Sequence, residues 1–528
     1  MQRLPKDNQL GGVESLDNTL LLINGNIITL DPDVNTKEIK WILIKDNKIQ
    51  ALGRGDQAPS CHQVIDLKGK TVLPGFIDAH VHSMFTSLYL NAVHLSKARS
   101  IKDVLDIIEE RCATSEEKLV LGMDLAPDHL KEERMPTRWE LDKVSGDKNI
   151  FIHHKSLHGG TCNTKVWDYL KVPLHMPGLE KTNGAFSGVI IDDISYEYAC
   201  LKILEQLDED ILVSNLYKLS EYALNKGVTT VHALSGGTEP KSHKDIVAIL
   251  ENQDKLPIHF IPYMEDFDVS KAKALGLPRV GGCLCLDGSR MVHTMAVSEP
   301  YSDRRELRGQ LYFTDDQVYN FVSTAHKENM QCAMHASGDR AIDQLIYTLN
   351  RVIKEQGDKK LRHRIEHFSL PTKKHMEMAA ELGIVLSMQP AFPYLWDQPD
   401  NSIYVKYFGK SRANRLEPFS EIIDAGGIIC GGSDSPVTEI DPLLGIHSCV
   451  NSPNPMRRTS VTEALKVFTT NGAYAGCEEN LRGMIKEKMM ADLVVIDKDP
   501  YKDKENIKDF NIEKVIVEGQ VSYQNQCK

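Results

Sequence analysis

Residues 73–82 read Leu73-Pro74-Gly75-Phe76-Ile77-Asp78-Ala79-His80-Val81-His82 and carry the strongest signal in the chain. A strand sends alternate side chains to the same face, so His80 and His82 project together if this stretch is a strand. Two imidazoles at one strand end provide half of a transition-metal site. A lone His-x-His pair is about as often two partly exposed histidines on a sheet edge. Its interpretation therefore depends on the rest of the chain.

Further donor residues follow other short apolar runs. His335 closes one such run, His367 closes the next, and Asp434 lies just after a third. The C-terminal ends of all strands in a (β/α)8 barrel converge on one face, where catalytic groups gather. Any one of these residues alone is more often structural, but all of them obey the same strand-end rule. We therefore expect the five donors to meet in space: His80, His82, His335, His367 and Asp434.

The middle of the chain has the rhythm of an α/β protein. Short apolar runs such as Gly383–Leu386 and Gly427–Cys430 alternate with amphipathic stretches, a pattern typical of parallel strands buried on both faces. We predict a (β/α)8 TIM barrel over residues 73–482. The part from about 110 to 200 fits this rhythm poorly and is rich in glycine and proline turns, so we expect an inserted subdomain there.

Both ends of the chain have the pattern of short strands. Trp41–Lys45 and Lys48–Leu52 flank a tight turn at Asp46-Asn47, and Asn24-Gly25-Asn26 breaks the run Leu20–Ile28 like a hairpin turn. Near the other end, Ala491–Asp497 and Val515–Val521 have the same character. We expect residues 19–72 and 483–526 to pair into one small β-sandwich domain.

The composition and net charge disfavour some classes of binding partner. The net charge of −12 disfavours a nucleic-acid partner, because non-specific affinity for phosphates depends on a basic surface. Residues 1–15 are polar, which predicts no secretory signal, and no apolar run approaches the roughly 18 residues that a bilayer requires. The eleven cysteines are scattered along the chain, which indicates a reducing cytoplasm. We also expect a small-molecule substrate and a homodimer, which is the commonest state of soluble oligomers.

The sequence resembles the amidohydrolase superfamily and, within it, the YtcJ-like branch (amidohydrolase family 3). The resemblance runs from about residue 20 to 520. The matching stretches are residues 73–82, Leu157-His158 with Asn163, residues 227–232, Asp287-Gly288-Ser289, and residues 335–343, 364–368, 432–436 and 488–497.

The resemblance implies a role for each donor. His80 and His82 would bind a metal from the first barrel strand, and His335 and His367 from the fifth and sixth. Asp434, from the eighth strand, would contact the metal and shuttle a proton. His158 resembles a histidine that reaches the substrate from the inserted region; the alternative is a loop histidine that caps the insert.

One position departs from many relatives, which carry a lysine four residues before the Asp-Gly-Ser motif that bridges two metals once carboxylated. Here the position is Cys283, and a strand would turn Cys283 and Cys285 to the same side. A thiolate is a good ligand for zinc or iron and could itself bridge two ions. Alternatively, both cysteines are small buried apolar residues. We expect zinc, with iron or manganese as alternatives, and leave open one or two ions per chain.

These residues predict metal-assisted hydrolysis. A divalent ion lowers the pKa of its water towards neutrality, Asp434 would take the proton and return it to the leaving nitrogen, and His158 or His367 would help to stabilise developing charge. The expected substrate has a non-peptide C–N bond in a small amide, N-acyl or cyclic amide compound.

Two other functions stay open. Hydrolytic deamination of an aromatic heterocycle uses the same metal and aspartate, and Phe392 and Trp396 could line a pocket for a planar group, although they could equally pack a long loop. A non-catalytic interaction protein on the same fold is the remote alternative, because such proteins lose the donors that are all present here.

Overall fold

The computed structural model describes residues 18–34, 39–55, 57–155, 157–205, 207–236, 243–398 and 400–525. The polar stretch 1–15, on which the prediction about a secretory signal was based, lies outside these residues, and so does position 526 of the predicted β-sandwich. Among the described residues, no helix combines the length and apolar character needed to cross a membrane.

Parallel strands alternate with helices through the middle of the described chain. One sheet has the order β15-β14-β7 and another the order β16-β17-β18-β19-β22, and a parallel bridge joins Val81, at the end of β7, to Ser435, beyond β22. Most of the strand residues are buried, as expected for strands covered on both faces. The predicted α/β class is confirmed. The strands are β7 (Phe76–Val81), β14 (Val228–Gly236), β15 (His259–Glu265), β16 (Arg279–Cys285), β17 (Gln331–Ala336), β18 (Arg364–His367), β19 (Val385–Met388) and β22 (Ile428–Gly431).

Amphipathic helices cover these strands. The helix α10 buries Ala341, Leu345 and Leu349, which recur every four residues along one face, and α9 begins with a capping box between Thr314 and Gln317. The helices of this region are α1 (Ser83–Tyr89), α6 (Glu209–Asn225), α7 (Lys244–Asn252), α8 (Val269–Ala274), α9 (Asp315–Lys327), α10 (Asp339–Gln356), α11 (Lys373–Glu381), α12 (Ala391–Trp396), α13 (Ile403–Ala413), α14 (Phe419–Asp424), α15 (Pro442–Asn451), α16 (Val461–Val467) and α17 (Thr470–Ala475).

The two ends of the chain share a sheet. β6 pairs antiparallel with β23 in the order β2-β6-β23-β24-β25, and a second sheet has the order β4-β3-β1-β5. Leu22, Ile42, Val72, Leu493 and Ile516 belong to one buried cluster that spans both sheets. The strands are β1 (Thr19–Ile23), β2 (Asn26–Ile27), β3 (Trp41–Lys45), β4 (Lys48–Gly53), β5 (Gln63–Asp66), β6 (Thr71–Pro74), β23 (Leu493–Ile496), β24 (Ile512–Val517) and β25 (Gln520–Gln524).

Of the two turns predicted near the start of the chain, one joins neighbouring antiparallel strands and the other does not. The turn at Asp46-Asn47 joins the antiparallel pair β3 and β4, as expected. The hairpin at Asn24-Gly25-Asn26 is wrong, because β1 pairs with β3 and β5 whereas β2 pairs with β6 in the other sheet. The turn therefore passes the chain from one sheet to the other.

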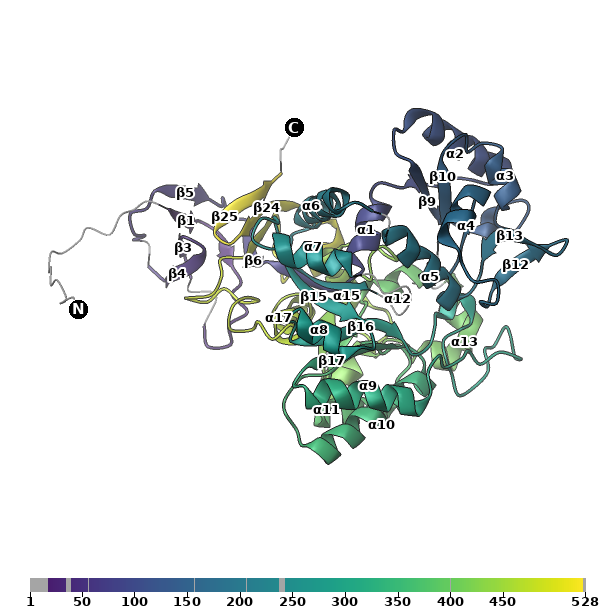
Figure 1. Cartoon of the computed structure of the whole chain (residues 1–528). Coiled ribbons are helices and arrows are strands. Elements are labelled where there is room, and N and C mark those ends of the chain that lie inside the picture. Colours follow the sequence, from purple (N-terminus) through teal and green to yellow (C-terminus); the bar gives the residue numbers. More distant parts are fainter. Residues whose placement is uncertain are drawn as a thin grey trace, which may run out of the picture.

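A further six-stranded sheet, β12-β13-β11-β10-β9-β8, occupies Val93–Ile190, so its first strand precedes the predicted start of the insertion near 110. It packs around its own buried cluster, which includes Val104, Ile150 and Val189. In Figure 1 it lies at the upper right, the sheets of the chain ends lie at the left, and the parallel strands lie between them. Its elements are β8 (Val93–His94), α2 (Ile101–Thr114), β9 (Leu119–Leu125), α3 (Arg138–Asp142), β10 (Asn149–His154), β11 (Gly160–Cys162), α4 (Thr164–Leu170), β12 (Leu179–Thr182) and β13 (Ala185–Ile190), followed by α5 (Asp193–Leu204).

Candidate metal centre

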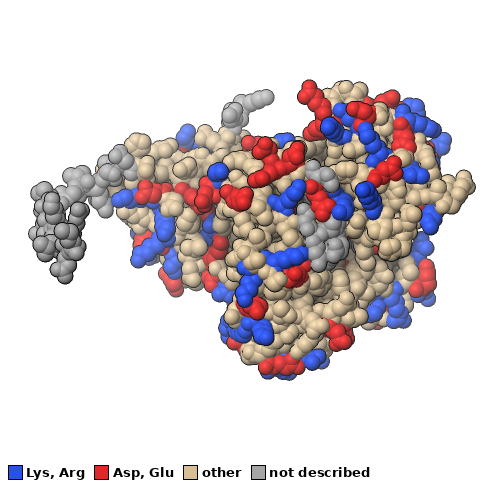
Figure 2. All heavy atoms as spheres, in the orientation of Figure 1, with Lys and Arg blue, Asp and Glu red and all other residues tan. Residues whose placement is uncertain are grey.

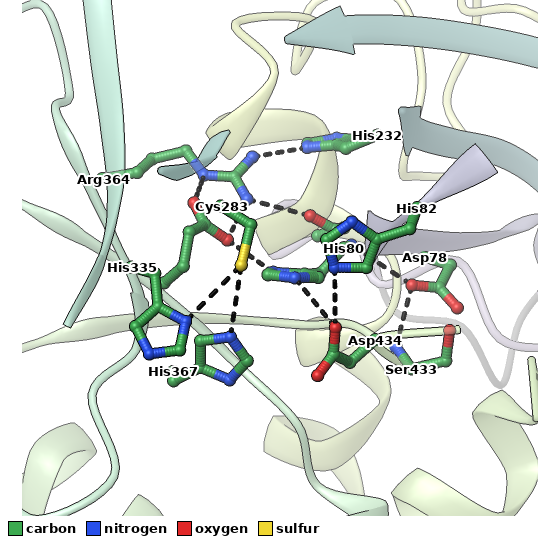
Figure 3. A network of polar contacts seen from close by, with 12 residues as sticks. Asp78, His80, His82, His232, Cys283, His335, Arg364, His367, Ser433 and Asp434 are labelled. Atoms are coloured by element: carbon green, nitrogen blue, oxygen red, sulfur yellow. Dashed lines mark hydrogen bonds and ion pairs between the residues drawn. The ribbon is translucent and has the colours of Figure 1, made fainter. Parts of the chain in front are cut away.

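His80, His82 and Asp434 converge at the ends of β7 and β22. The Asp434 Oδ1 atom lies 3.2 Å from His80 Nε2 and 3.1 Å from His82 Nε2 (Figure 3). A backbone hydrogen bond from Asp434 N to His80 O, 2.9 Å long, holds the two strand ends together. Asp434 has a φ of 59°, a conformation that is uncommon outside glycine and is often found at functional sites.

Cys283, His335 and His367 form a second group beside the first. The Cys283 Sγ atom lies 3.5 Å from His335 Nδ1 and 3.7 Å from His367 Nε2. The ring of His367 is 5.0 Å from that of His80, which joins the two groups. One donor atom from each of His80, Cys283 and His367 lies within 4.8 Å of the others, and the same holds for Cys283 with Cys285 and His335. Cys283 therefore lies where the groups meet.

The donor atoms fit a divalent transition metal. His80 Nε2 is buried and makes no hydrogen bond, although the Asp434 carboxylate is only 3.2 Å away. A ring nitrogen that lies this close to a carboxylate oxygen without a hydrogen bond is the arrangement expected of two ligands of one ion. Imidazole, thiolate and carboxylate are the ligands that zinc takes in proteins. All six predicted ligands lie in these two groups.

Two buried carboxylates for which the sequence predicts no role lie beside the histidine rings: Glu366 beside His80 and Asp287 beside His335. His80 Nδ1 lies 2.8 Å from Glu366 Oε2, and Arg364 donates to both oxygens of Glu366 at 2.8 Å. Arg364 also donates to the carbonyl oxygen of Ala79 at 2.8 Å. An Nδ1–H that donates to Glu366 leaves Nε2 of His80 as the metal-facing lone pair.

Asp287 lies beside His335, although His335 Nε2 makes no hydrogen bond. Its Oδ1 lies 3.3 Å from His335 Nε2, and its two oxygens accept the backbone N–H groups of Ala296, Ser337 and Gly338 at 2.8–3.0 Å. Asp287 is fully buried, so these bonds fix the loop after β17 against the metal group.

The carboxylates of Asp434 and Glu366 balance the positive charge of a protonated His80. Burial of the His80 ring opposes protonation, but the Asp434 and Glu366 carboxylates outweigh it and raise the pKa of His80 to about 9. Burial likewise opposes ionisation of Asp434, yet His80 and His82 hold the pKa of Asp434 well below its usual range. A proton on His80 therefore occupies the position that a metal ion would take, and metal binding would release it.

A cavity of about 1320 Å³ opens onto these groups. His82, Cys283, His335, His367 and Asp434 line it, while His80 is buried behind them. The predicted substrate residues His158, Phe392 and Trp396 line the same cavity. The Phe392 ring stacks at 6.5 Å from the His367 ring and 4.2 Å from that of Trp396, so aromatic surface adjoins the metal groups.

The inserted sheet contributes His158 to this cavity. His158 is half-buried on the loop after β10, close enough to His154 that burial and the charge of His158 lower the pKa of His154 to about 4. On the face drawn in Figure 2, acidic and basic side chains are interspersed rather than gathered into one basic surface.

Metal donors at the ends of parallel strands, facing a cavity, are the arrangement of a metal-dependent enzyme. The sequence model of the Amidohydrolase family matches residues 63–523. The chain therefore belongs to the amidohydrolase family, whose members are metal-dependent hydrolases acting on carbon–nitrogen bonds other than peptide bonds. The predicted resemblance, including the YtcJ-like branch, is confirmed.

Individual relatives match along nearly the whole chain. The chain is 24% identical to the N-substituted formamide deformylase of Arthrobacter pascens, over 91% of this chain and 94% of that protein. It is 25% identical to the putative amidohydrolase YtcJ of Bacillus subtilis, over 87% and 90%. A crystal structure of an uncharacterized metal-dependent hydrolase from Pyrococcus horikoshii superposes with a TM-score of 0.77 at 26% identity, covering 92% of this chain and 99% of that one.

Proposed function

We propose that this chain hydrolyses a non-peptide C–N bond in a small amide, N-acyl or cyclic amide compound. One observation carries the proposal: two groups of metal donors meet at Cys283 and His80 and face a cavity large enough for a small molecule. The name of the Arthrobacter pascens relative supports an amide as the first substrate class to test.

We assign the two groups to two zinc ions, with iron or manganese as alternatives. His80, His82 and Asp434 would hold one ion and His335 and His367 the other, with Cys283 between them. A bound divalent ion supplies Lewis acidity, which lowers the pKa of water and polarises a carbonyl oxygen.

The protein's own residues would handle the proton and the charge. Asp434 is held ionised by His80 and His82, so it can accept a proton from the attacking water and return it to the leaving nitrogen. His158 and His367 both line the cavity and would stabilise charge on the substrate oxygen.

We also propose that the parallel strands close into one (β/α)8 barrel over residues 73–482. The bridge between Val81 and Ser435 supports closure on one side, and the contacts between β15 and β16 support it on the other. On this proposal residues 19–72 and 483–526 form the composite β-sandwich, and the insertion lies at about 110–200. We further propose a homodimer in the cytoplasm that binds neither nucleic acid nor membrane; among the described residues no disulfide joins the ten cysteines, which supports the compartment.

Hydrolytic deamination of an aromatic heterocycle is the second candidate. The aromatic wall of Phe392 and Trp396 beside His367 favours it, because a planar ring could lie against these side chains. Release of ammonia without formation of a new carboxylate would identify this reaction.

The test is turnover of formamides, N-acyl compounds, cyclic amides and amino-heterocycles by zinc-loaded protein. Asp434→Asn should lower kcat by at least ~10²-fold while the fold is kept, because the proton acceptor is lost. Glu439→Gln, an exposed carboxylate on the same cavity, is the matched control and should turn over normally. Full activity of the Asp434→Asn variant would refute the assignment.

A further inference from the structure

Arg290 is a buried cation on the wall of the cavity that the hydrolytic roles above do not use. It starts a short 3-10 turn, Arg290–Val292, directly after the Asp287-Gly288-Ser289 motif, and only 5% of its surface is exposed. It lines the same cavity as His367 and Asp434. A guanidinium is rarely buried without acceptors for its N–H groups, so its partners show what it can still bind.

Aromatic rings fix the position of the guanidinium. Its central carbon lies 4.8 Å from the ring centre of Tyr404, 5.4 Å from that of Phe392 and 5.8 Å from that of Trp396. Contacts of this kind are favourable for an arginine and limit its rotation. The donors of Arg290 are therefore held in place before any substrate arrives.

Only part of the guanidinium has a protein acceptor. Nη1 donates to Glu417, a carboxylate that is almost fully buried. Within the described parts of the chain, this is the hydrogen bond that Arg290 makes, so the Nε–H and Nη2–H groups are left over. These two groups form the planar fork that receives both oxygens of a carboxylate.

The Arg290 guanidinium and the metal groups both lie next to Phe392. The centre of the Phe392 ring is 6.5 Å from that of His367 and 5.4 Å from the Arg290 guanidinium. Phe392 therefore lies between a metal-donor histidine and Arg290. A small molecule whose C–N bond lies at His367 and Asp434 could therefore extend along Phe392 to Arg290.

The lysine side chains that line the cavity, Lys155 and Lys406, are open to solvent. The carboxylates of Glu265 and Asp434 line it as well and are buried. Water and salt screen exposed charges, whereas a buried guanidinium acts through a lower dielectric. Among the lysine and arginine side chains on the cavity, Arg290 is therefore the one best placed to attract an anionic group of a ligand.

We infer that Arg290 is a specificity-determining residue that binds a carboxylate of the substrate. The substrate class is then an amide that carries a carboxylate, such as an N-acyl amino acid or a carboxylated cyclic amide. This inference rests on the proposed function for the reaction, but the recognition of the carboxylate itself does not require the metal.

The experiment compares two probes that differ only in charge: N-acetylphenylalanine and its neutral amide, N-acetylphenylalaninamide. Their Kd values are measured by titration calorimetry on zinc-loaded and on chelator-treated full-length protein. The wild-type protein should bind the acid about 10-fold more tightly than the amide or better, in both preparations, as expected for a bidentate charged pair. Lys406→Met is the matched control, since it removes an exposed cation from the same cavity, and should keep this preference.

Arg290→Lys keeps the charge but lacks the fork, and should lose most of the preference for the acid while binding the amide as before. If Arg290→Lys does not fold, the double variant Arg290→Met with Glu417→Gln removes the whole ion pair and should also show equal Kd values for the two probes. Retention of the preference in either variant overturns the inference.

Equal affinity of the wild-type protein for the two probes also overturns it. So does a preference that disappears on chelation, because the metal would then hold the carboxylate. Failure of the proposed function looks different: zinc-loaded protein would hydrolyse none of the amide classes, while the preference for the acid would persist in the chelator-treated protein.

Discussion

At the residue scale, the centre depends on buried carboxylates as much as on its ligands. Glu366 holds Nδ1 of His80 at 2.8 Å and Asp287 lies 3.3 Å from Nε2 of His335. The hydrogen bond to Glu366 selects which ring nitrogen of His80 is free to bind a metal, and outer contacts of this kind commonly change metal affinity when they are lost.

Glu366→Gln should therefore lower zinc affinity by about 10–100-fold, because the amide no longer enforces the tautomer of His80. Competition with a zinc-binding dye measures this affinity. Asp343→Asn is a suitable control, since Asp343 pairs with His375 outside the centre and should leave zinc affinity unchanged. Unchanged affinity in Glu366→Gln would mean that Glu366 serves only Arg364.

Much of the site could be predicted at this scale. All five strand-end donors and Cys283 lie together, because parallel strands bring their C-terminal ends to one face however far apart they are in sequence. Glu366 could have been found as well: Arg364 and Glu366 flank Ile365 in a short strand, an alternation that predicts an ion pair on one face. Arg290 could not, because its partner Glu417 lies on a distant loop with no pattern to link them.

At the element scale, the centre requires the end of β22 to lie against β7. A Cβ atom at Gly432 would come within 2.4 Å of His80 Cβ and 2.6 Å of His80 N. Glycine is thus needed for the close approach that brings Asp434 to His80 and His82. The neighbouring Ser433 N–H, which donates to Asp78 at 2.9 Å, ties the same two strands.

Gly432→Ala should separate β22 from β7, weaken zinc binding by at least ~10-fold and abolish most activity, because a buried overlap forces backbone shifts. Gly55→Ala is the control, since a Cβ at Gly55 would meet no atom within 4 Å. Zinc titration and thermal unfolding of both variants check the expectation. Wild-type zinc affinity in Gly432→Ala would show that the strand ends can move apart without affecting the ligands.

The elements also show the limits of local signals. The turn at Asp46-Asn47 was predicted because both of its strands pair with each other. The turn at Asn24-Gly25-Asn26 has equally suitable residues, yet its strands pair with β3 and β6 in different sheets. Turn residues specify a change of direction, whereas the choice of partner depends on distant strands such as β23.

At the scale of the whole molecule, buried neutral histidines make stability depend on pH. Burial lowers the pKa of His153 to about 3, and burial and the neighbouring His326 lower that of His363 to about 3. The unfolded chain binds protons at these histidines below pH ~6.5 while the folded chain does not, so stability falls as the pH drops from about 6.5 towards 3. Burial of Asp78, whose pKa is raised to about 6, acts in the opposite direction between about 6 and its ordinary value.

His153→Asn isolates one of these groups. Between pH 7.5 and 5.5 the wild-type protein should lose about 1.4 kcal/mol more free energy of unfolding than this variant, which is the linkage expected of one histidine that stays neutral. Urea denaturation of chelator-treated protein at both pH values measures the difference. Equal losses would mean that His153 is protonated in the folded protein at pH 5.5.

The metal content of the protein tests most directly whether Cys283 joins two metal ions in one centre. Chain purified without chelators or added metal is analysed beside Cys283→Ala and beside Cys449→Ala, a buried cysteine remote from the donor groups. We predict about two equivalents per chain in the wild-type protein and in Cys449→Ala, falling to about one or fewer in Cys283→Ala. About one equivalent in all three proteins would contradict a centre in which Cys283 joins two ions.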